Sequence, residues 1–526
     1  MTSGHIAQLA GQLKAHGVAY AFGVVGSGPS LRLVLALEQA GVPYYPVAHE
    51  AAAALMAGAC CRFGTTRGVA ITIKGPGFIN LLPGVLSNLY ENRPALTISE
   101  AYPPDTPRSR THKRAEHQVL SASLAKGFAF ADGEAGTVTA LLAVGECEVP
   151  GPVHLELAAN PVAGVSVVNT PCPPVQAVDD AALENVIRSI RSSKRPALVL
   201  GCSAWRRLPG IKWDKAGVPV CTTAPGKGAV DETSPFAGGI VTGEVKELSP
   251  EKAVLDQADL IIGIGLRNTE VILAKPYAAP LILLDFLDGN LHQGFEPVLR
   301  LIASDLNGAA ERILEELARR SWGDVEIAQR TQRLSEALLS EKWMPAPVFR
   351  RLQAALGPEA VLCLDTGLFC TVGETVWQST SAETFCGSSV GRFMGTALPT
   401  SIGVAISAPS RPVVCVCGDG GIRPYLPEVK LAVEHQLPLL LVLMTDGRYG
   451  TIGAGAPPEA KDHPALTIHD PHWWRVLDAM GCPARAVSSL TELDRALSEW
   501  NFNAGPLFLE AGFDPYLYRA MTEKLR

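Results

Sequence analysis

The chain has 526 residues, enough for about three domains of ordinary size, so a single small binding module is excluded. Its formal net charge is −7, and this mildly acidic balance argues against a nucleic-acid partner. Charged residues make up 18% of the chain and hydrophobic residues 47%, which favours much buried surface in cores or between subunits, and therefore an oligomer.

The apolar segments predict no membrane-spanning helix. A run such as residues 437–444 falls far short of the roughly 20 residues that span a bilayer. Residues 1–6 do not begin a basic and then apolar signal sequence, so we expect a cytoplasmic protein. The 12 cysteines are too few for a disulfide framework, and those in apolar segments are expected to pack as small hydrophobic side chains.

Strand-like apolar runs alternate with helical patterns along the whole chain, which predicts an α/β fold with doubly wound parallel sheets. Breaks in this alternation at residues 169–174 and 344–347 suggest three domains, spanning residues 1–165, 178–325 and 345–526. The expected strands are Ala19–Val25, Val69–Ile73, Ala95–Ser99, Ala197–Gly201, Leu260–Gly265, Leu281–Asp285, Val361–Asp365, Val413–Cys417 and Leu439–Met444.

The middle domain contains a short glycine motif, Gly263-Ile264-Gly265, directly after a strand. It lacks the third glycine and the acidic partner of a dinucleotide-binding fingerprint. We therefore interpret it as a tight turn, which argues against a nicotinamide-dependent oxidoreductase.

The third domain carries the strongest chemical signal. Asp419, in the run Gly418-Asp419-Gly420-Gly421, follows one buried strand, and Asp446 follows the next, with a helical segment to about residue 436 between them. The carboxyl ends of parallel strands meet at one sheet edge, where two carboxylates can hold a hard divalent cation. Glycines there let backbone N–H groups approach phosphate oxygens.

This segment resembles the diphosphate-binding motif of thiamine diphosphate enzymes, which runs from Gly-Asp-Gly through a long spacer to Asn-Asn. The resemblance implies that Asp419 and Asp446 hold Mg²⁺ through their side chains and Arg448 through its backbone carbonyl. Asp446 departs from the family, which has Asn there. The added charge attracts Mg²⁺ and repels diphosphate, so its net effect stays open, as does a plain turn-capping role.

The first domain extends the resemblance. Residues 47–59 and 73–80, with a His-Glu pair and a Gly-Pro-Gly turn, are similar to the pyrimidine-binding domain of the acetolactate synthase and benzoylformate decarboxylase branch. In that family the Glu, here Glu50, is the carboxylate that activates the cofactor. Considered alone, Glu50 is a favourable first-turn charge on an Ala-rich helix.

Other cofactor contacts follow from the same resemblance. Met394, in residues 391–399, matches the bulky residue beneath the cofactor. Considered alone, it reads as an ordinary core residue. The further cofactor-binding residues implied are Asn80, Gly367, Leu368, Arg392, Gly420, Gly421, Tyr449, Gly450 and Thr451.

Four residues, Ser27, Lys74, His112 and Ile452, are candidates for the substrate pocket, and Lys113 is a possible helper of Lys74. Ser27 aligns with a serine that contacts the substrate carboxylate in benzoylformate decarboxylases, or it caps a helix. Lys74, with His112 and Lys113, is expected to bind an acid group, because a buried lysine needs an anionic partner; a solvated surface lysine is the alternative. Ile452 takes the place of a glutamate found in pyruvate decarboxylases.

These observations lead to one function hypothesis and two alternatives. The resemblance implies a thiamine diphosphate- and Mg²⁺-dependent decarboxylase of a 2-oxo acid with carboligase activity. The alternatives are an acetolactate synthase-like transferase and a non-catalytic protein with the same fold. Active sites in the family lie between subunits, which implies a homodimer or homotetramer. FAD binds the middle domain of some members, and no residue here decides that point.

Overall fold

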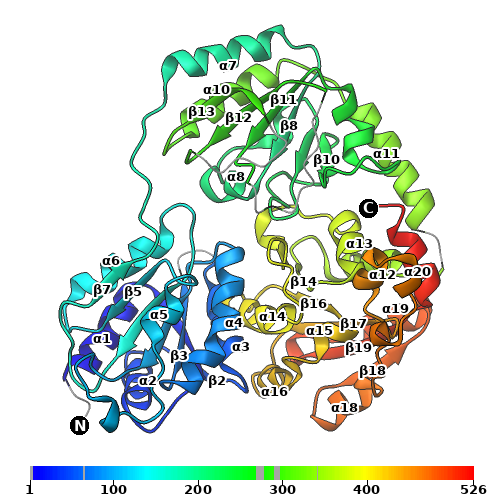
Figure 1. Ribbon diagram of the computed structural model, residues 1–526. Helices are drawn as coiled ribbons and strands as arrows, with labels where there is room; N and C mark the ends of the chain where they lie inside the picture. Colours follow the sequence, from blue (N-terminus) through cyan, green and yellow to red (C-terminus); the bar gives the residue numbers. More distant parts are fainter. Residues whose placement is uncertain are drawn as a thin grey trace.

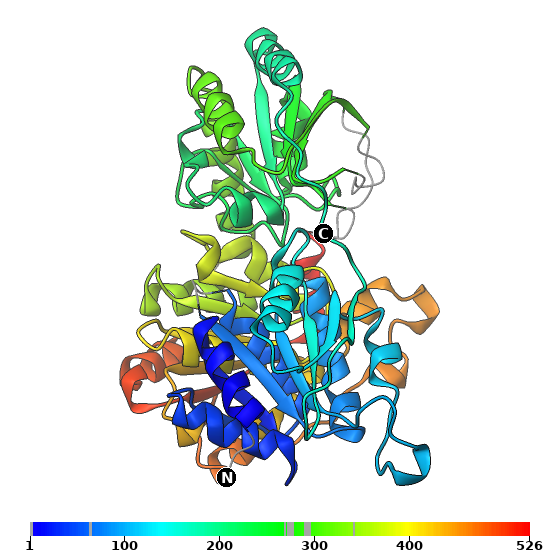
Figure 2. The same cartoon turned by 90° about the vertical axis from the view of Figure 1, so that its left-hand side faces the viewer.

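The computed structural model describes residues 4–62, 66–267, 270, 278–288, 296–339 and 342–525. The chain folds into three α/β domains, each built on its own sheet, which confirms the predicted fold class (Figure 1). The middle domain lies above the other two in both views (Figure 2). Within the described residues, no helix combines the length and the apolar character needed to cross a membrane.

The first sheet has seven strands in the order β2-β1-β3-β4-β6-β5-β7, and only β7 runs antiparallel to its neighbour. Its strands are β1 (Val18–Val24), β2 (Tyr44–Pro46), β3 (Arg67–Thr72), β4 (Leu96–Glu100), β5 (Gly127–Phe130), β6 (Val153–Leu157) and β7 (Ser166–Val168). Its helices are α1 (Gly4–Ala15), α2 (Pro29–Gln39), α3 (Glu50–Cys60), α4 (Pro76–Tyr90), α5 (His117–Ser121) and α6 (Ala135–Glu146).

The middle sheet has six parallel strands in the order β10-β9-β8-β11-β12-β13. Gly265 turns the chain after β11 with a φ of +66°, and a Cβ there would lie 1.7 Å from Ser203 Oγ, so the motif forms the expected tight turn. The strands are β8 (Pro196–Leu200), β9 (Val220–Thr222), β10 (Ala237–Ile240), β11 (Leu260–Ile264), β12 (Leu281–Asp285) and β13 (Pro297–Ile302). The helices are α7 (Asp180–Ser192), α8 (Cys202–Arg207), α9 (Pro250–Ala253) and α10 (Asn307–Leu317).

The third sheet also has six parallel strands, in the order β15-β14-β16-β17-β19-β18, and α11 (Asp324–Leu338) precedes it. Its strands are β14 (Val361–Leu364), β15 (Phe385–Gly387), β16 (Val413–Gly418), β17 (Leu439–Thr445), β18 (Ala484–Val487) and β19 (Leu507–Gly512). Its helices are α12 (Pro345–Leu356), α13 (Leu368–Val376), α14 (Ala397–Ser407), α15 (Asp419–Ile422), α16 (Val429–Glu434), α17 (Gly450–Gly455), α18 (Trp473–Ala479), α19 (Leu490–Glu499) and α20 (Pro515–Thr522).

The helix expected between the two acidic motifs is interrupted. After α15 the chain forms a separate 3-10 turn, η5 (Leu426–Glu428), before α16 begins. Pro424 and Pro427 explain the break, because proline lacks the N–H donor that a continuous helix requires. Glu428 is the last residue of this turn and directly precedes α16.

Helix α3 is the main link between the first and third domains. All eleven of its residues are buried, and its apolar side chains join α14 in one hydrophobic cluster. A Cβ on Gly403 of α14 would lie 2.7 Å from the carbonyl oxygen of Met56, so the two helices approach closely. Because α3 packs within the first domain and against α14 of the third, its first residue, Glu50, is held by contacts from two domains.

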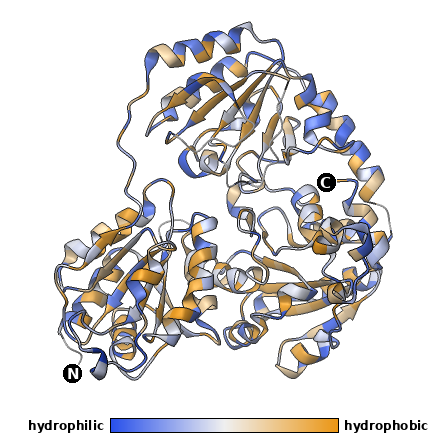
Figure 3. Ribbon diagram, viewed as in Figure 1, coloured by the Kyte–Doolittle hydropathy of each residue, from blue (hydrophilic) through white to orange (hydrophobic). Residues whose placement is uncertain are grey.

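The strands of all three sheets are predominantly apolar (Figure 3).

Candidate active site

The two acidic motifs of the third domain meet at the carboxyl ends of neighbouring strands. Strand β16 ends at Gly418, which lies opposite Met444 in β17, so Asp419 and Asp446 leave the sheet at the same edge. Asp419 is 3% exposed, and its Oδ2 accepts hydrogen bonds from the backbone N–H groups of Asp446 and Gly447, both at 3.0 Å. Its Oδ1 accepts no hydrogen bond from any described residue, as expected of an oxygen available to a cation.

The electrostatics of this carboxylate pair fit a bound cation. Burial, followed by the negative charge of Asp419, raises the pKa of Asp446 to about 6. Burial also raises the pKa of Asp419. A divalent cation between them would stabilise both charges, and carboxylate oxygens are the ligands that Mg²⁺ prefers. The Arg448 guanidinium bonds Asp462 Oδ1 at 2.9 Å and therefore offsets the added charge of Asp446 only in part.

The glycines beside Asp419 allow close approach of the backbone. A Cβ on Gly420 would lie 2.5 Å from Met394 Sδ, and a Cβ on Gly421 would lie 2.0 Å from Asp365 Oδ2. Asp365 is held in turn by the N–H of Gly395, at 2.9 Å from each carboxylate oxygen. Side chains are therefore excluded here, which leaves backbone N–H groups free to face an anion such as a diphosphate.

One cavity of about 340 Å³ brings together most of the predicted cofactor residues. Every described residue that lines it belongs to the third domain, and Met394 and Ile452 on its wall are 45% and 60% exposed. The predicted residues on its lining are Gly367, Leu368, Arg392, Met394, Asp419, Gly420, Gly421, Asp446, Arg448, Tyr449, Gly450, Thr451 and Ile452.

Sequence reasoning missed several residues of this lining. Tyr518, on the C-terminal helix α20, lies far along the chain from both motifs, and no pattern in the sequence connects it with them. Thr366 directly precedes the predicted Gly367, and Gly418 begins the run Gly418-Asp419-Gly420-Gly421, so their position in the sequence could have indicated both residues. Phe369 and Met444 are the other additions.

Glu50 and Asn80 form a second group, in the first domain. Glu50 is 8% exposed, and its Oε2 accepts a hydrogen bond of 3.0 Å from Asn80 Nδ2. The preceding residue, His49, caps α3 by accepting the N–H of Ala51 at its Nδ1. The family resemblance implies that both Glu50 and Asn80 contact the cofactor, and in the structure they contact each other.

The four candidate substrate residues do not all converge. Lys74 Nζ bonds Glu100 Oε2 at 3.0 Å and lies 5.1 Å from the centre of the Tyr102 ring, so its charge already has a partner. Although burial opposes ionisation of Glu100, hydrogen bonds from Ser30 and then Lys74 keep its pKa below the usual value. Ser27 is exposed and does not cap α2, whose first turn instead donates the N–H of Ser30 to Glu100 Oε1 at 3.1 Å. Ile452 lies apart from them, in the third domain.

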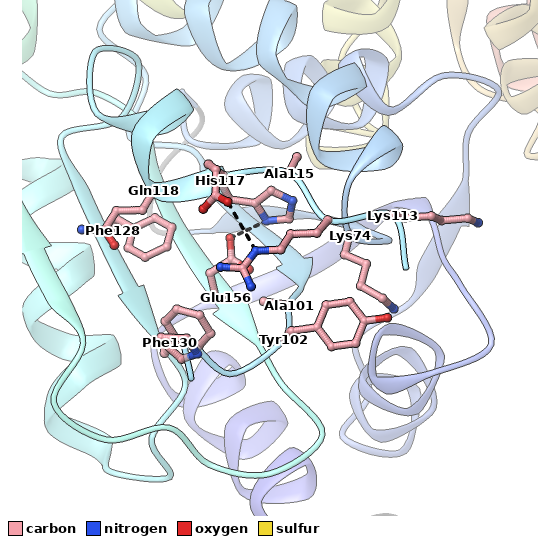
Figure 4. Close-up of a pocket in the computed structure, with 13 residues that line it drawn as sticks. Lys74, Ala101, Tyr102, Lys113, Ala115, His117, Gln118, Phe128, Phe130 and Glu156 are labelled. Atoms are coloured by element: carbon pink, nitrogen blue, oxygen red, sulfur yellow. Dashed lines mark hydrogen bonds and ion pairs between the residues drawn. The ribbon is translucent and has the colours of Figure 1, made fainter. Parts of the chain in front are cut away.

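A smaller cavity of about 120 Å³ in the first domain includes Lys74 and Lys113, whereas His112 does not line it (Figure 4). Its inner wall holds His117, whose Nδ1 lies 2.8 Å from Glu156 Oε1, and this carboxylate oxygen also lies 2.9 Å from His154 Nε2. In Figure 4 the side chain of Lys113 extends away from this pair.

His117, His154 and Glu156 have the composition of a metal site, with ligand atoms within 4.8 Å of one another. The hydrogen bonds argue otherwise. His117 Nε2 accepts the backbone N–H of Gly75 at 3.0 Å, so Nδ1 carries the ring proton and donates it to Glu156. A nitrogen that carries a proton cannot ligate a metal, so we assign this cluster as a hydrogen-bonded support of the Gly-Pro-Gly turn.

In the middle domain, the acidic residue at the end of β12 is already paired. Asp285 Oδ1 accepts a hydrogen bond of 2.8 Å from Arg267, which also bonds Glu148 of the first domain at 3.1 Å. All three side chains are nearly fully buried. This network joins the two domains and leaves Asp285 unavailable to a nucleotide ribose unless the network rearranges.

Comparison with known proteins agrees with this arrangement. Residues 6–121 match the N-terminal TPP binding domain of thiamine pyrophosphate enzymes, residues 183–304 the central domain, and residues 365–511 the C-terminal TPP binding domain. Thiamine pyrophosphate, abbreviated TPP in these names, is another name for thiamine diphosphate.

Several known proteins are similar to this chain over most of their length. A catabolic acetolactate synthase of Raoultella terrigena is 28% identical over 84% of this chain and 82% of its own. A probable 2-ketoarginine decarboxylase, AruI of Pseudomonas aeruginosa, is 23% identical over 95% and 92%. Human 2-hydroxyacyl-CoA lyase 1 is 23% identical over 93% and 91%. With all three domains matched in order, the chain belongs to the thiamine pyrophosphate enzyme family.

Proposed function

We propose that this protein is a thiamine diphosphate- and Mg²⁺-dependent decarboxylase of a 2-oxo acid, able to pass the acyl group to a second carbonyl compound. The observation that carries the proposal is the carboxylate pair Asp419 and Asp446 in a glycine-lined cavity, with Asp419 Oδ1 bonded to no described residue, on a chain that also holds Glu50 against Asn80. Bound thiamine diphosphate supplies a nucleophilic carbon and an electron sink for cleavage of the bond next to the carbonyl group.

The third domain would bind the diphosphate end of the cofactor. Asp419 Oδ1 and the Asp446 carboxylate would hold Mg²⁺ together with the Arg448 carbonyl, and the backbone around Gly420 would face the phosphate oxygens. Met394, whose sulfur lies beside Gly420, would support the cofactor rings from below.

The first domain would supply proton transfer. Asn80 occupies Oε2 of Glu50, and no other described residue bonds this carboxylate, so Oε1 is left to exchange a proton with the cofactor. Burial of Glu50 keeps bulk water away from that exchange. The fixed start of α3 keeps the carboxylate in one orientation.

The reaction balances without a further reactant. The bond between the carboxylate carbon and the carbonyl carbon breaks, CO₂ leaves, and a proton takes its place to give an aldehyde. When a second carbonyl compound accepts the acyl carbon instead, the product is a hydroxyketone. The similarity to the catabolic acetolactate synthase favours this second outcome as an alternative main activity.

Substrate recognition would fall to residues at the edges of the two cavities. Lys74 remains the proposed partner of a substrate acid group, and it would have to share its ammonium with Glu100. Lys113 adds a second cation nearby, because it lines the same cavity. Ser27 and His112 stay candidates, while Ile452 offers an apolar wall on the other domain.

A second copy of the chain would complete the site. The larger cavity has no lining from the described part of the first domain, and its walls carry the exposed side chains of Met394 and Ile452. We therefore propose a homodimer or homotetramer with each cofactor between two chains. Analytical ultracentrifugation tests this, and a monomer that binds cofactor would refute it.

Cofactor titration followed by a substrate survey tests the function. Calorimetry on cofactor-free protein should show thiamine diphosphate uptake that requires Mg²⁺. CO₂ release is then measured over a panel of 2-oxo acids, with and without an aldehyde acceptor. Cofactor binding without turnover of any panel member would favour the non-catalytic alternative, and carboligation without free aldehyde would favour the synthase-like one.

A further inference from the structure

Glu428 makes a contact between domains at the start of the helix that carries Glu50. It is the last residue of η5 in the third domain, and it is 2% exposed. Its Oε1 accepts the backbone N–H groups of Ala48 at 3.1 Å and His49 at 3.0 Å, and its Oε2 lies 3.2 Å from the nitrogen of Ala48. Ala48 and His49 directly precede Glu50.

The need for this acceptor follows from the sequence of α3. The first N–H groups of a helix lack partners within the helix, and a Glu or Gln at the third helical position often accepts the N–H of the capping residue. In α3 this third position is Ala52, which cannot do so. Glu428 supplies the missing acceptor from a different domain, 379 residues away from His49.

The surroundings hold Glu428 in one place. Pro427 directly precedes it and restricts the backbone. In the same segment, the Tyr425 ring packs edge-on against the His49 ring, with 5.9 Å between the ring centres. Burial raises the pKa of Glu428 to about 7, against the opposing effect of the N–H groups of Ala48 and His49, so its charge is poorly solvated. Burying a carboxylate costs free energy, so a carboxylate that a protein keeps in a buried position is a candidate for a functional role.

We propose that Glu428 is a positioning residue, which orients Glu50 toward the cofactor by accepting the backbone N–H groups just before it. The inference rests on the proposed function, because it assigns Glu50 the role of the activating carboxylate. What matters is the acceptor oxygen: a glutamine at this position retains it, and a leucine of similar size does not.

The experiment compares Glu428→Leu and Glu428→Gln with a matched control. Glu251 is also buried, and its Oε1 accepts the N–H groups of Thr242 at 2.7 Å and Gly243 at 2.6 Å, in the middle domain. Glu251→Leu therefore removes a comparable structural carboxylate far along the chain from Glu50. Calorimetry gives the thiamine diphosphate Kd of each variant.

Two readouts separate positioning from general stability. In cofactor-free protein, amide hydrogen exchange at residues 48–52 should rise at least tenfold in Glu428→Leu and stay within threefold of wild type in Glu428→Gln. In loaded protein, exchange of the thiazolium C2 proton with deuterium, followed by NMR after acid quench, should fall at least tenfold in Glu428→Leu, with the cofactor Kd changed less than threefold. Glu251→Leu should leave both unchanged.

The remaining outcomes contradict either the positioning role of Glu428 or the proposed function on which it rests. A normal C2 exchange rate in Glu428→Leu, or an equal loss in Glu428→Gln, would show that the acceptor oxygen does not position Glu50. A similar loss in Glu251→Leu would show that general destabilisation is responsible. If wild type takes up no thiamine diphosphate, the proposed function fails, whereas normal amide protection of residues 48–52 in Glu428→Leu would refute the anchoring contact itself.

Discussion

Asn80 donates a hydrogen bond of 3.0 Å to Glu50, and this contact joins the first residue of α3 to the second turn of α4. The two helices follow different strands of the first sheet, yet they present these side chains to each other at its edge. The pair leaves one carboxylate oxygen of Glu50 for chemistry and fixes the other.

Removing the carboxylate of Glu50 should abolish most activity. We expect Glu50→Gln to lower CO₂ release by about 10²–10⁴-fold, the usual contribution of a general acid or base. Thiamine diphosphate binding, measured by calorimetry, should change far less. Asn80→Ala should give a smaller loss, about tenfold, because the carboxylate remains but is less well oriented. Equal losses in the two variants would contradict this division of roles.

Asp446→Asn should stabilise the metal-free protein and weaken Mg²⁺ binding. Folding raises the pKa of Asp446 to about 6, above its unfolded value, so its contribution to stability is full at low pH and is lost as pH rises through 6. In EDTA the variant should therefore be more stable than wild type at pH 8, by roughly 1–3 kcal/mol, and the advantage should shrink at pH 5.

Calorimetry with Mg²⁺ checks the other half of this prediction. Loss of one carboxylate ligand should weaken Mg²⁺ affinity by about tenfold in the presence of thiamine diphosphate. Tighter binding in the variant would show that repulsion between Asp446 and the diphosphate is the larger effect.

Lys74→Met should raise the KM for an acidic substrate and should also cost stability. The variant leaves the Glu100 carboxylate, which is 2% exposed, without its ammonium partner, at a cost of about 1–3 kcal/mol. The double variant Lys74→Met/Glu100→Gln should recover the melting temperature but not the KM. Recovery of both would mean that Lys74 serves only to neutralise Glu100.

The two glycines after Asp419 should differ in their tolerance of alanine. A Cβ at Gly421 meets Asp365, whose carboxylate is fixed by the Gly395 N–H, so Gly421→Ala should destabilise by about 1–3 kcal/mol. A Cβ at Gly420 would lie 2.5 Å from the sulfur of Met394, a flexible side chain, and 2.9 Å from Cε1 of Tyr449, so Gly420→Ala should cost less stability than Gly421→Ala and should weaken cofactor binding by displacing these two cavity residues. Thermal unfolding and calorimetry on both variants provide the comparison.

The sequence alone was enough to predict the site residues that lie at the ends of strands. Continuous apolar runs identified the parallel strands, and parallel strands bring Asp419 and Asp446 to one edge whatever lies between them. Contacts between segments far apart in the chain could not be predicted, because the residues around Glu428 and around Tyr518 do not indicate which distant segment each side chain contacts. The same holds for His117, because its partners Gly75 and Glu156 come from other loops and strands.

The run from Asp419 to Glu428 spans only α15 and η5, yet it carries a candidate metal ligand at one end and the anchor of α3 at the other. An engineer who wants a new substrate range should therefore leave this run intact. Ile452 lies on another segment of the cavity wall, and replacing it would alter the space offered to a substrate while leaving the contact between Glu428 and α3 in place.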